Sequence, residues 1–287
     1  MKVGCSTYSY HRNFEAGKID LEGFLEKMFR FNVDGVELLD LHVTPDPGNL
    51  RRLKRLGLKL GIETAAVTIH PSLEVESISP PESKRVAEPT KKIDKWIEIA
   101  SLMGAPVLRV DVIRTPKEMS QEEAIKVNID SVKRCIPHAV EKGITMGIEN
   151  HGGVTSNAEN IIKIVKGVGS EWYGVVLDFG NFGLEERAYE EMEKVAPYAM
   201  FCHAKTLEFG LASQGLEPHW EEKRIDYRKI MDILRRRGYN GYLSLEYEGD
   251  ESEGTAVPKG IGFLRRLVQA ERGSRRIVGG KNPCQKR

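Results

Sequence analysis

Four apolar runs follow one another in the second half of the chain: ITMGIENHGG (144–153), YGVVLDFGN (173–181), AMFCHAKT (199–206) and GYLSLEYEG (241–249). Short continuous apolar runs are typical of parallel strands that are buried on both faces. Within each stretch the apolar part ends at an acidic or imidazole side chain, namely Glu149, Asp178, His203 and Glu246. Since the packing of a buried strand does not require an ionisable residue at its carboxyl end, these four residues predict one shared site.

The rest of the chain repeats the same alternation of short apolar runs and longer amphipathic segments. Predicted strands cover residues 3–6, 35–38, 59–67, 107–110, 145–149, 174–178, 200–204 and 242–246. Predicted helices cover 20–31, 90–103, 120–142, 156–168, 226–236 and 256–270, with weaker patterns at 47–55 and 185–195. Capping-box pairs start two of them, Ser120 with Glu123 and Ser156 with Glu159. Eight βα units without a break in composition predict a single (β/α)8 TIM barrel over residues 1–270.

Composition and charge exclude several classes of protein. Lys and Arg number 43 against 42 Asp and Glu, so the net charge of +1 indicates neither nucleic acid nor a membrane surface as partner. Residues 271–287 carry six Lys or Arg and one Glu, and we expect a flexible basic tail there. The four cysteines form no C-x-x-C pair, no run reaches the roughly 18 apolar residues of a membrane helix, and the first strand begins within three residues of Met1. These features predict a cytoplasmic protein.

The four residues at the strand ends suit a catalytic metal ion. Active sites of such barrels lie at the carboxyl ends of the strands. Two glutamates, one aspartate and one histidine offer three oxygen donors and one nitrogen, which favours Mn²⁺ over Mg²⁺, Co²⁺ or Zn²⁺ and leaves a position open for substrate. Because paired carboxylates remove a proton on one side and return it on the other, Glu149 and Glu246 are the predicted acid and base.

Other polar residues near the strand ends are candidates for substrate binding, and each also has a purely structural interpretation. Lys205 suits either an enolate oxygen or an ion pair with Asp178 or Glu246, and Arg109 suits either substrate or an ion pair with Asp111. The remaining candidates in this group are His70, His151 and the hydroxyl of Tyr8. The connection between His203 and residue 226 is too long for a plain loop and predicts a lid or binding loop.

With these residues placed, residues 1–270 resemble the sugar phosphate isomerase/epimerase family, the xylose isomerase-like barrels. The likeness lies in GIENHGG, VVLDFGN, CHAKT and RIDYRKIMDIL followed by GYNGYLSLE. Members of this family include ketose 3-epimerases, hydroxypyruvate isomerases, inosose dehydratases and dehydroshikimate dehydratases. The resemblance implies that Glu149, Asp178, His203 and Glu246 bind one divalent metal and that Glu149 and Glu246 exchange protons with the substrate.

The chain departs from the family pattern at two places. Asn181 stands where many members have a histidine three residues after the aspartate, and residues 219–224 replace a glycine-rich stretch, with Arg224 a candidate for contact with a substrate oxygen. The related endonuclease IV needs further His and Asp ligands that this chain lacks. Acidic residues follow Glu246, namely Glu248, Asp250, Glu251 and Glu253, and they disfavour a phosphorylated substrate.

The sequence therefore predicts a metal-dependent isomerase or epimerase of a small polyol, ketose or other hydroxyketone, acting through an enediolate. Two alternatives remain at this stage. A dehydratase would use the same proton abstraction and then lose a β-hydroxyl, and a catalytically silent barrel would bind sugars without exchanging their protons. A homo-oligomer is compatible with the sequence.

Overall fold

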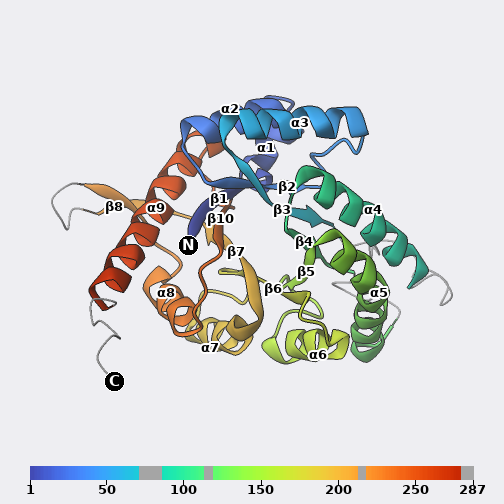
Figure 1. The fold of residues 1–287 in the computed structure, drawn as a ribbon. Helices are drawn as coiled ribbons and strands as arrows, with labels where there is room; N and C mark the ends of the chain where they lie inside the picture. Colours follow the sequence, from blue (N-terminus) through green and yellow to red (C-terminus); the bar gives the residue numbers. More distant parts are fainter. Residues whose placement is uncertain (71–85, 113–118, 213–217, 279–287) are drawn as a thin grey trace, which may run out of the picture.

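Eight parallel strands close into a barrel at the centre of the molecule (Figure 1). The computed structural model describes residues 1–70, 86–112, 119–212 and 218–278. The barrel strands, in chain order, are β1 Lys2–Ser6, β2 Gly35–Leu39, β3 Glu63–Ile69, β4 Val107–Val110, β5 Thr145–Glu149, β6 Tyr173–Asp178, β7 Ala199–Thr206 and β10 Tyr242–Tyr247. Each pairs with its neighbour in the chain, and β1 pairs with both β2 and β10. The predicted TIM barrel is confirmed.

Helices form a ring outside the strands (Figure 1). They are α2 Leu21–Arg30, α3 Pro47–Leu60, α4 Ala87–Met103, α5 Gln121–Lys142, α6 Ala158–Val168, α7 Glu186–Val195, α8 Tyr227–Arg236 and α9 Glu253–Val278, with short turns at η1 Thr7–Tyr10, α1 His11–Glu15 and η3 Ala196–Tyr198. Leu, Ile, Val and Met side chains of these helices pack on the outward-facing residues of the strands in one continuous core. The predicted tail begins within α9, and residues 279–287 lie outside the described residues.

Several predicted boundaries are wrong. The helices predicted over 47–55 and 256–270 are longer, since α3 runs to Leu60 and α9 covers Glu253–Val278. The strand predicted from residue 59 begins at Glu63, because residues 59 and 60 complete α3 and Gly61, with φ of 69°, ends that helix in the left-handed conformation. Helix α6 does not begin with the predicted capping box. The side chain of Asn157, rather than Ser156, accepts from the backbone of Asn160, whereas the box of Ser120 and Glu123 is present as predicted.

The barrel interior is apolar toward the amino ends of the strands and polar toward their carboxyl ends. Ala66, Val107, Val176 and Phe201 form a small cluster, against which Tyr242 packs. The side chains two residues further along these strands share the same face, because side chains of a strand alternate. Thr68, Arg109, Asp178 and His203 therefore lie one layer nearer the carboxyl end of the barrel.

The long connection between β7 and α8 forms an antiparallel hairpin of β8 Phe209–Ala212 and β9 His219–Glu222, which projects beside α9 in Figure 1. Lys259 of α9 lies over the ring of Trp220, with Nζ 4.0 Å from its centroid. The connection thus has structure of its own, and part of it packs on the outer helix layer.

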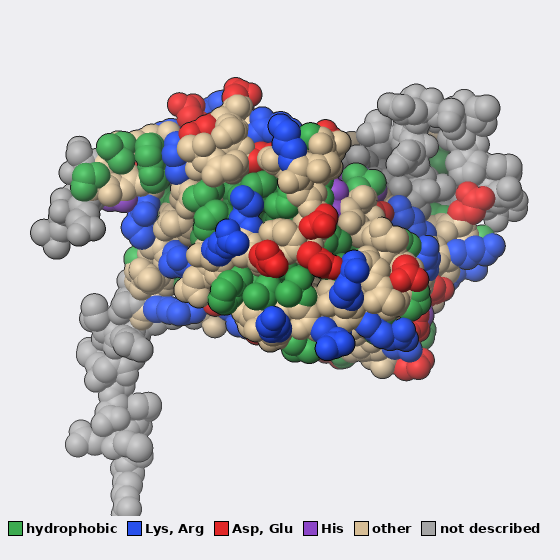
Figure 2. All heavy atoms as spheres, turned by 90° about the horizontal axis from the view of Figure 1, so that it is seen from above, with side chains coloured by type: hydrophobic (Ala, Val, Ile, Leu, Met, Phe, Trp, Pro, Cys, Tyr) green, Lys and Arg blue, Asp and Glu red, His purple; other side chains and the backbone are tan. Residues whose placement is uncertain are grey.

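The outer surface mixes charges of both signs. Over α2 and α3, Figure 2 shows Lys and Arg side chains interspersed with Asp, Glu and apolar side chains. In the described residues no helix combines the length and apolar character that crossing a membrane requires. The three cysteines of this part, Cys5, Cys135 and Cys202, are buried free thiols.

Candidate metal centre

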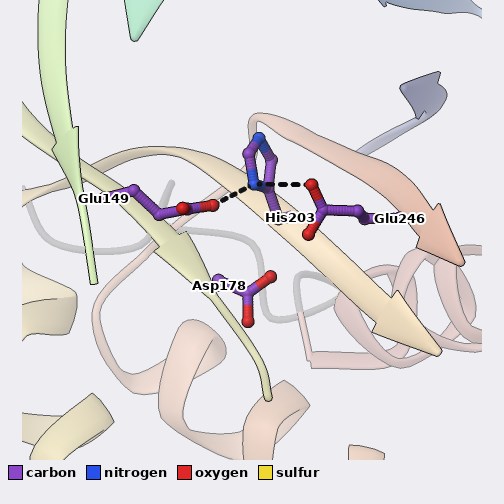
Figure 3. A group of neighbouring side chains, drawn as sticks. All are labelled: Glu149, Asp178, His203 and Glu246. Carbon is purple, nitrogen blue, oxygen red and sulfur yellow. Dashed lines mark hydrogen bonds and ion pairs between the residues drawn. The ribbon is translucent and has the colours of Figure 1, made fainter. Parts of the chain in front are cut away.

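Glu149, Asp178, His203 and Glu246 converge at the carboxyl end of the barrel (Figure 3). They come from β5, β6, β7 and β10, and all four are buried. Asp178 and His203 are directly opposite in the register of β6 and β7, while Glu246 lies opposite Lys205. One oxygen or nitrogen atom from each of the four lies within 4.8 Å of all the others. The strand-end residues that the sequence singles out are thus brought together.

Their free atoms face a common point. Nδ1 of His203 contacts Oε1 of Glu149 and lies 3.6 Å from Oε1 of Glu246. Oδ1 of Asp178 accepts from the backbone N–H groups of Gly180 and Asn181, both at 2.8 Å, which leaves its Oδ2 free to face the others. Oε2 of Glu149 lies 2.7 Å from Nη2 of Arg109 and 2.5 Å from Nδ1 of His151. Oδ2 of Asp178 lies 3.5 Å from Nζ of Lys205 and, within the described part of the chain, is buried without a hydrogen bond. A buried oxygen of this kind is a donor that a bound cation satisfies.

The electrostatics of the four residues also fit a cation. Burial raises the pKa of Asp178 well above its usual value despite the nearby ammonium of Lys205. Burial would raise the pKa of Glu149 too, but Arg109 and His203 hold it well below its usual value. Burial would lower the pKa of His203, yet Glu37, Glu246 and Glu149 hold it well above 6.5. Three buried carboxylates crowded around one imidazole are the kind of charge that a divalent ion offsets.

The second ring nitrogen of His203, Nε2, also forms a hydrogen bond. Its Nε2–H donates to Oε1 of Glu37 on β2 at 2.8 Å, and Glu37 is fully buried. Hydroxyl groups of Thr68 and Ser244 donate to the same carboxylate at 2.5 and 3.0 Å. Sequence reasoning missed Glu37, although an ionisable residue within the apolar run GVELL is the same kind of signal that revealed the other four.

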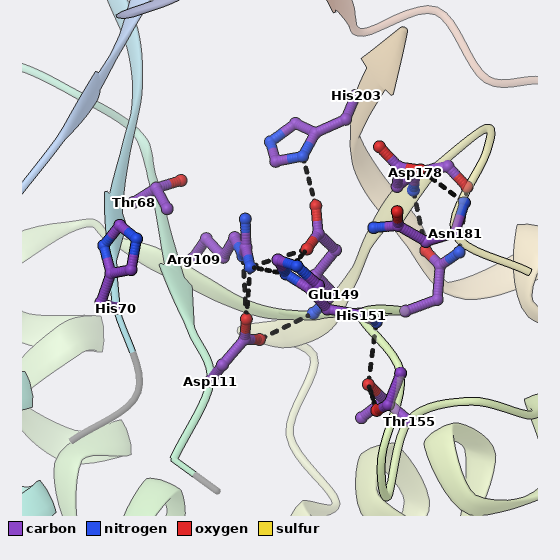
Figure 4. A network of polar contacts seen from close by, with 12 residues as sticks. Thr68, His70, Arg109, Asp111, Glu149, His151, Thr155, Asp178, Asn181 and His203 are labelled. Atoms are coloured by element: carbon purple, nitrogen blue, oxygen red, sulfur yellow. Dashed lines mark hydrogen bonds and ion pairs between the residues drawn. The ribbon is translucent and has the colours of Figure 1, made fainter. Parts of the chain in front are cut away.

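Arg109 is the centre of an ion-pair cluster beside Glu149 (Figure 4). Its Nη2 lies 2.5 Å from Oδ2 of Asp111, 2.7 Å from Oε2 of Glu149 and 2.6 Å from Nδ1 of His151. Oδ1 of Asp111 accepts from the backbone N–H of Glu149 at 3.1 Å. Asp111, Glu149 and His151 also meet the distance criterion for a metal site, but Arg109 already supplies the positive charge there.

Lys205 occupies the opposite side of the four residues. Its Nζ donates to Oδ1 of Asn181 at 2.8 Å and to Oε1 of Glu248 at 2.9 Å, and lies 3.2 Å from Glu246 and 3.5 Å from Asp178. Burial would lower the pKa of Lys205, but these carboxylates, Asp178 first among them, hold it well above its usual value. The ammonium group is therefore an ion-pair partner of the site.

A cavity of about 150 Å³ opens above Glu246. Its walls are Tyr8, Leu39, Thr68, Ile69, His70, Arg109, His151, Glu246 and Glu248. The volume equals that of about five water molecules in the liquid at roughly 30 Å³ each, which suits a small ligand. Asp40 orients His70 by accepting from its backbone N–H at 3.2 Å and contacting its Nδ1 at 2.7 Å. Four predicted substrate contacts, Tyr8, His70, Arg109 and His151, thus share one cavity.

The other predicted substrate contacts lie elsewhere. Asn181 and Lys205 lie close to the four converging residues but are not among the described lining residues. Arg224 is exposed, and its backbone N–H donates to Glu222 at 2.7 Å. A larger hollow of about 660 Å³ lies at the amino end of the barrel, where Met1, Lys2 and Glu63 line it, and it is remote from the four strand-end residues.

Comparison with known proteins places the chain in a family. Residues 25–267 match the family model described as xylose isomerase-like TIM barrel. The chain belongs to this family. No curated protein matches the chain in sequence.

Several solved structures share the fold over nearly the whole chain. A D-tagatose 3-epimerase-like protein is 20% identical with a TM-score of 0.70, and the match covers 96% of this chain and 99% of that one. D-Psicose 3-epimerase from Clostridium cellulolyticum, solved with D-tagatose, is 18% identical with a TM-score of 0.69 and coverages of 90% and 89%. The IolI protein, solved with a zinc atom, is 18% identical with a TM-score of 0.70 and coverages of 91% and 94%. At these identities the likeness shows the fold.

Proposed function

We propose that this barrel is a divalent-metal-dependent isomerase or epimerase of a small ketose or other hydroxyketone. The observation that carries the proposal is the convergence of three carboxylates and one imidazole within 4.8 Å, beside a cavity that Glu246 lines. Glu149, Asp178, His203 and Glu246 would bind the ion, with Mn²⁺ favoured by the donor set. When bound, the ion supplies polarisation of a substrate carbonyl or hydroxyl.

Glu149 and Glu246 are the proposed proton-transfer pair. They lie on either side of Nδ1 of His203, so a substrate held between them presents a different face to each carboxylate (Figure 3). Burial raises the pKa of Glu246, but Lys205 and His203 hold it below its usual value, so this carboxylate is in the ionised form that a general base requires. Removal of a proton next to a carbonyl gives an enediolate, and return of a proton gives the isomer or epimer.

The walls of the cavity support a neutral substrate. Glu246 and Glu248 contribute negative charge, and Arg109 is already engaged by Asp111 and Glu149. Among the described residues of the wall, a phosphate would meet these carboxylates and no cation that is not already paired, so an uncharged sugar is favoured. Tyr8, His70 and His151 offer hydrogen bonds to its hydroxyl groups. The D-psicose 3-epimerase solved with D-tagatose shares the fold, which is consistent with a ketose.

A dehydratase is the second candidate because His70 lies in the same cavity. Its ring is oriented by Asp40, whose carboxylate also lies 3.1 Å from Nζ of Lys92. A protonated His70 would deliver a proton to a departing β-hydroxyl after the same abstraction by a glutamate. Both reactions begin with removal of a substrate proton by a glutamate.

Solvent deuterium incorporation tests the proposal. Mn²⁺-loaded protein in D₂O would be incubated with ketoses, their phosphates, inososes and dehydroshikimate, and products analysed by mass spectrometry. Deuterium in an unchanged skeleton indicates an isomerase or epimerase, and loss of water, with or without deuterium in the product, indicates a dehydratase.

Variants make the assignment specific. Glu246→Gln should abolish exchange, whereas Glu63→Gln, an exposed residue at the start of β3, should not. Sugar binding without any exchange by the metal-loaded protein would contradict the proposal in favour of a silent barrel.

A further inference from the structure

Glu37 is a buried carboxylate to which the proposed chemistry assigns no role. Its side chain points into the barrel from β2, and the residue is 0% exposed. A buried carboxylate is unfavourable unless hydrogen bonds compensate its lost hydration. Three donors from three other strands do so: Nε2–H of His203, Oγ1–H of Thr68 and Oγ–H of Ser244.

The fold does not require a carboxylate at this position. Barrel interiors are normally filled by branched apolar side chains, and β2 has valine and leucine on either side of Glu37. Replacing buried ionic groups with apolar groups of similar volume is often neutral or stabilising. Packing therefore does not explain the charge at Glu37 or the two hydroxyl groups that orient it. The contact of Glu37 with one particular residue explains both better.

That residue is His203, and the contact determines which ring nitrogen is available. An imidazole binds a metal through a nitrogen that carries no proton. Nδ1 of His203 faces Glu149 and Glu246 (Figure 3). Its Nε2 faces Glu37. Because a carboxylate accepts but does not donate, Glu37 favours a proton on Nε2, so Nδ1, which contacts Glu149 in the metal-free protein, is the nitrogen left to bind an ion.

We infer that Glu37 is a positioning residue of the metal centre, which raises divalent-ion affinity by holding His203 in the binding tautomer and orientation. The inference rests on the proposed function, since it concerns the same ion. A carboxylate behind a ligand histidine also makes the imidazole a stronger donor, and loss of such a partner typically weakens metal binding about 10–100-fold.

The test compares Mn²⁺ affinity of metal-free parent and Glu37→Gln by isothermal titration calorimetry. Glutamine keeps the shape and can accept from His203 and Thr68 through Oε1 while its amide donates to Ser244, so mainly the charge is lost. We expect Glu37→Gln to bind Mn²⁺ about 10–100-fold more weakly than the parent. Glu63→Gln, a glutamate on β3 at the amino end of the barrel, should bind like the parent.

A purely structural role for Glu37 would change the melting temperature of the metal-free protein and leave Mn²⁺ affinity unchanged. That result would overturn the inference while leaving the metal site intact. If the parent itself binds no divalent ion, the proposed function fails and the inference fails with it, so the two failures are distinguishable.

A second variant covers the case in which Glu37→Gln does not fold. Thr68→Val is nearly isosteric and removes the hydroxyl that donates to Oε1 of Glu37 at 2.5 Å. We expect weaker Mn²⁺ binding, by a smaller factor than for Glu37→Gln. Parent-like affinity in a folded Thr68→Val protein, with Glu37→Gln unfolded, would overturn the inference.

Discussion

Replacement of Arg109 by methionine should strongly destabilise the metal-free barrel. Arg109 is 6% exposed, and its guanidinium lies within 2.7 Å of oxygens of both Asp111 and Glu149. At 2.7 Å and an effective dielectric of about 20, one such pair contributes about 6 kcal/mol of attraction, which is offset in part by the loss of hydration. Removing one partner of a buried pair typically costs 3–5 kcal/mol because the other charge is left uncompensated.

The assay is urea unfolding of metal-free Arg109→Met followed by circular dichroism. A loss of about 3–5 kcal/mol in the free energy of unfolding is expected. Arg52→Met is the matched control, since its 2.6 Å pair with Glu22 lies at the surface with side-chain exposures of 68% and 40%. Surface pairs contribute about 0–1 kcal/mol. The two arginines thus form similar contacts in different surroundings.

The source of the loss can be tested with a second substitution. If the unpaired carboxylate of Glu149 causes the loss of stability, Glu149→Gln in the Arg109→Met background should recover part of the free energy of unfolding. Saturating Mn²⁺ should also reduce the difference in the free energy of unfolding between Arg109→Met and the parent. An Arg109→Met protein as stable as Arg52→Met would refute the argument, because the cluster would then contribute no more than a surface pair.

Three further outcomes are expected. Glu149→Gln and Glu246→Gln should each lower kcat at least about 100-fold, which is the lower end of the contribution of a general acid or base. A near-normal kcat in either variant would contradict the role of that residue in proton transfer. Mn²⁺ at 100 times its Kd should raise the free energy of unfolding by about 2.7 kcal/mol, reversed by EDTA, and an unchanged urea midpoint would argue against a native metal site. Asp178 and His203 have raised pKa values in the metal-free protein, so the stability that they contribute is lost as pH rises, which for His203 begins above 6.5. Glu149 and Glu246 have lowered pKa values, so the stability that they contribute is lost as pH falls below 4.5. Mn²⁺ binding should consequently release protons and tighten as pH rises above 6.5, and calorimetry in buffers of different ionisation enthalpy measures this release; proton uptake would contradict it.

Much of the fold could be predicted from local patterns. Apolar runs of strand length alternate with amphipathic segments, and this order specifies a (β/α)8 barrel because each element's periodicity is a property of its own residues. The family follows from motifs around Glu149, Asp178, His203 and Glu246, and the family match confirms it. The errors at residue 59 and at Ser156 are errors of helix ends, where one glycine or one competing cap decides the boundary.

The partners of each ionisable side chain depended on the closed barrel. Glu37 and His203 are 166 residues apart in the chain, and they meet only because β2 and β7 are brought across the same interior. Likewise, strand register decides that Lys205 and Arg109 form ion pairs with the site. The position of the hairpin decides that Arg224 is exposed.

The sequence by itself thus determined the order of strands and helices, the family and the identity of the four strand-end residues, since these are encoded in contiguous stretches. Only the tertiary structure decided which ring nitrogen of His203 faces the other three, which carboxylate lies behind it and which polar residues line the cavity. The physical reason is that hydrogen bonds and ion pairs act over about 3 Å, whereas the residues that form them here come from strands throughout the chain.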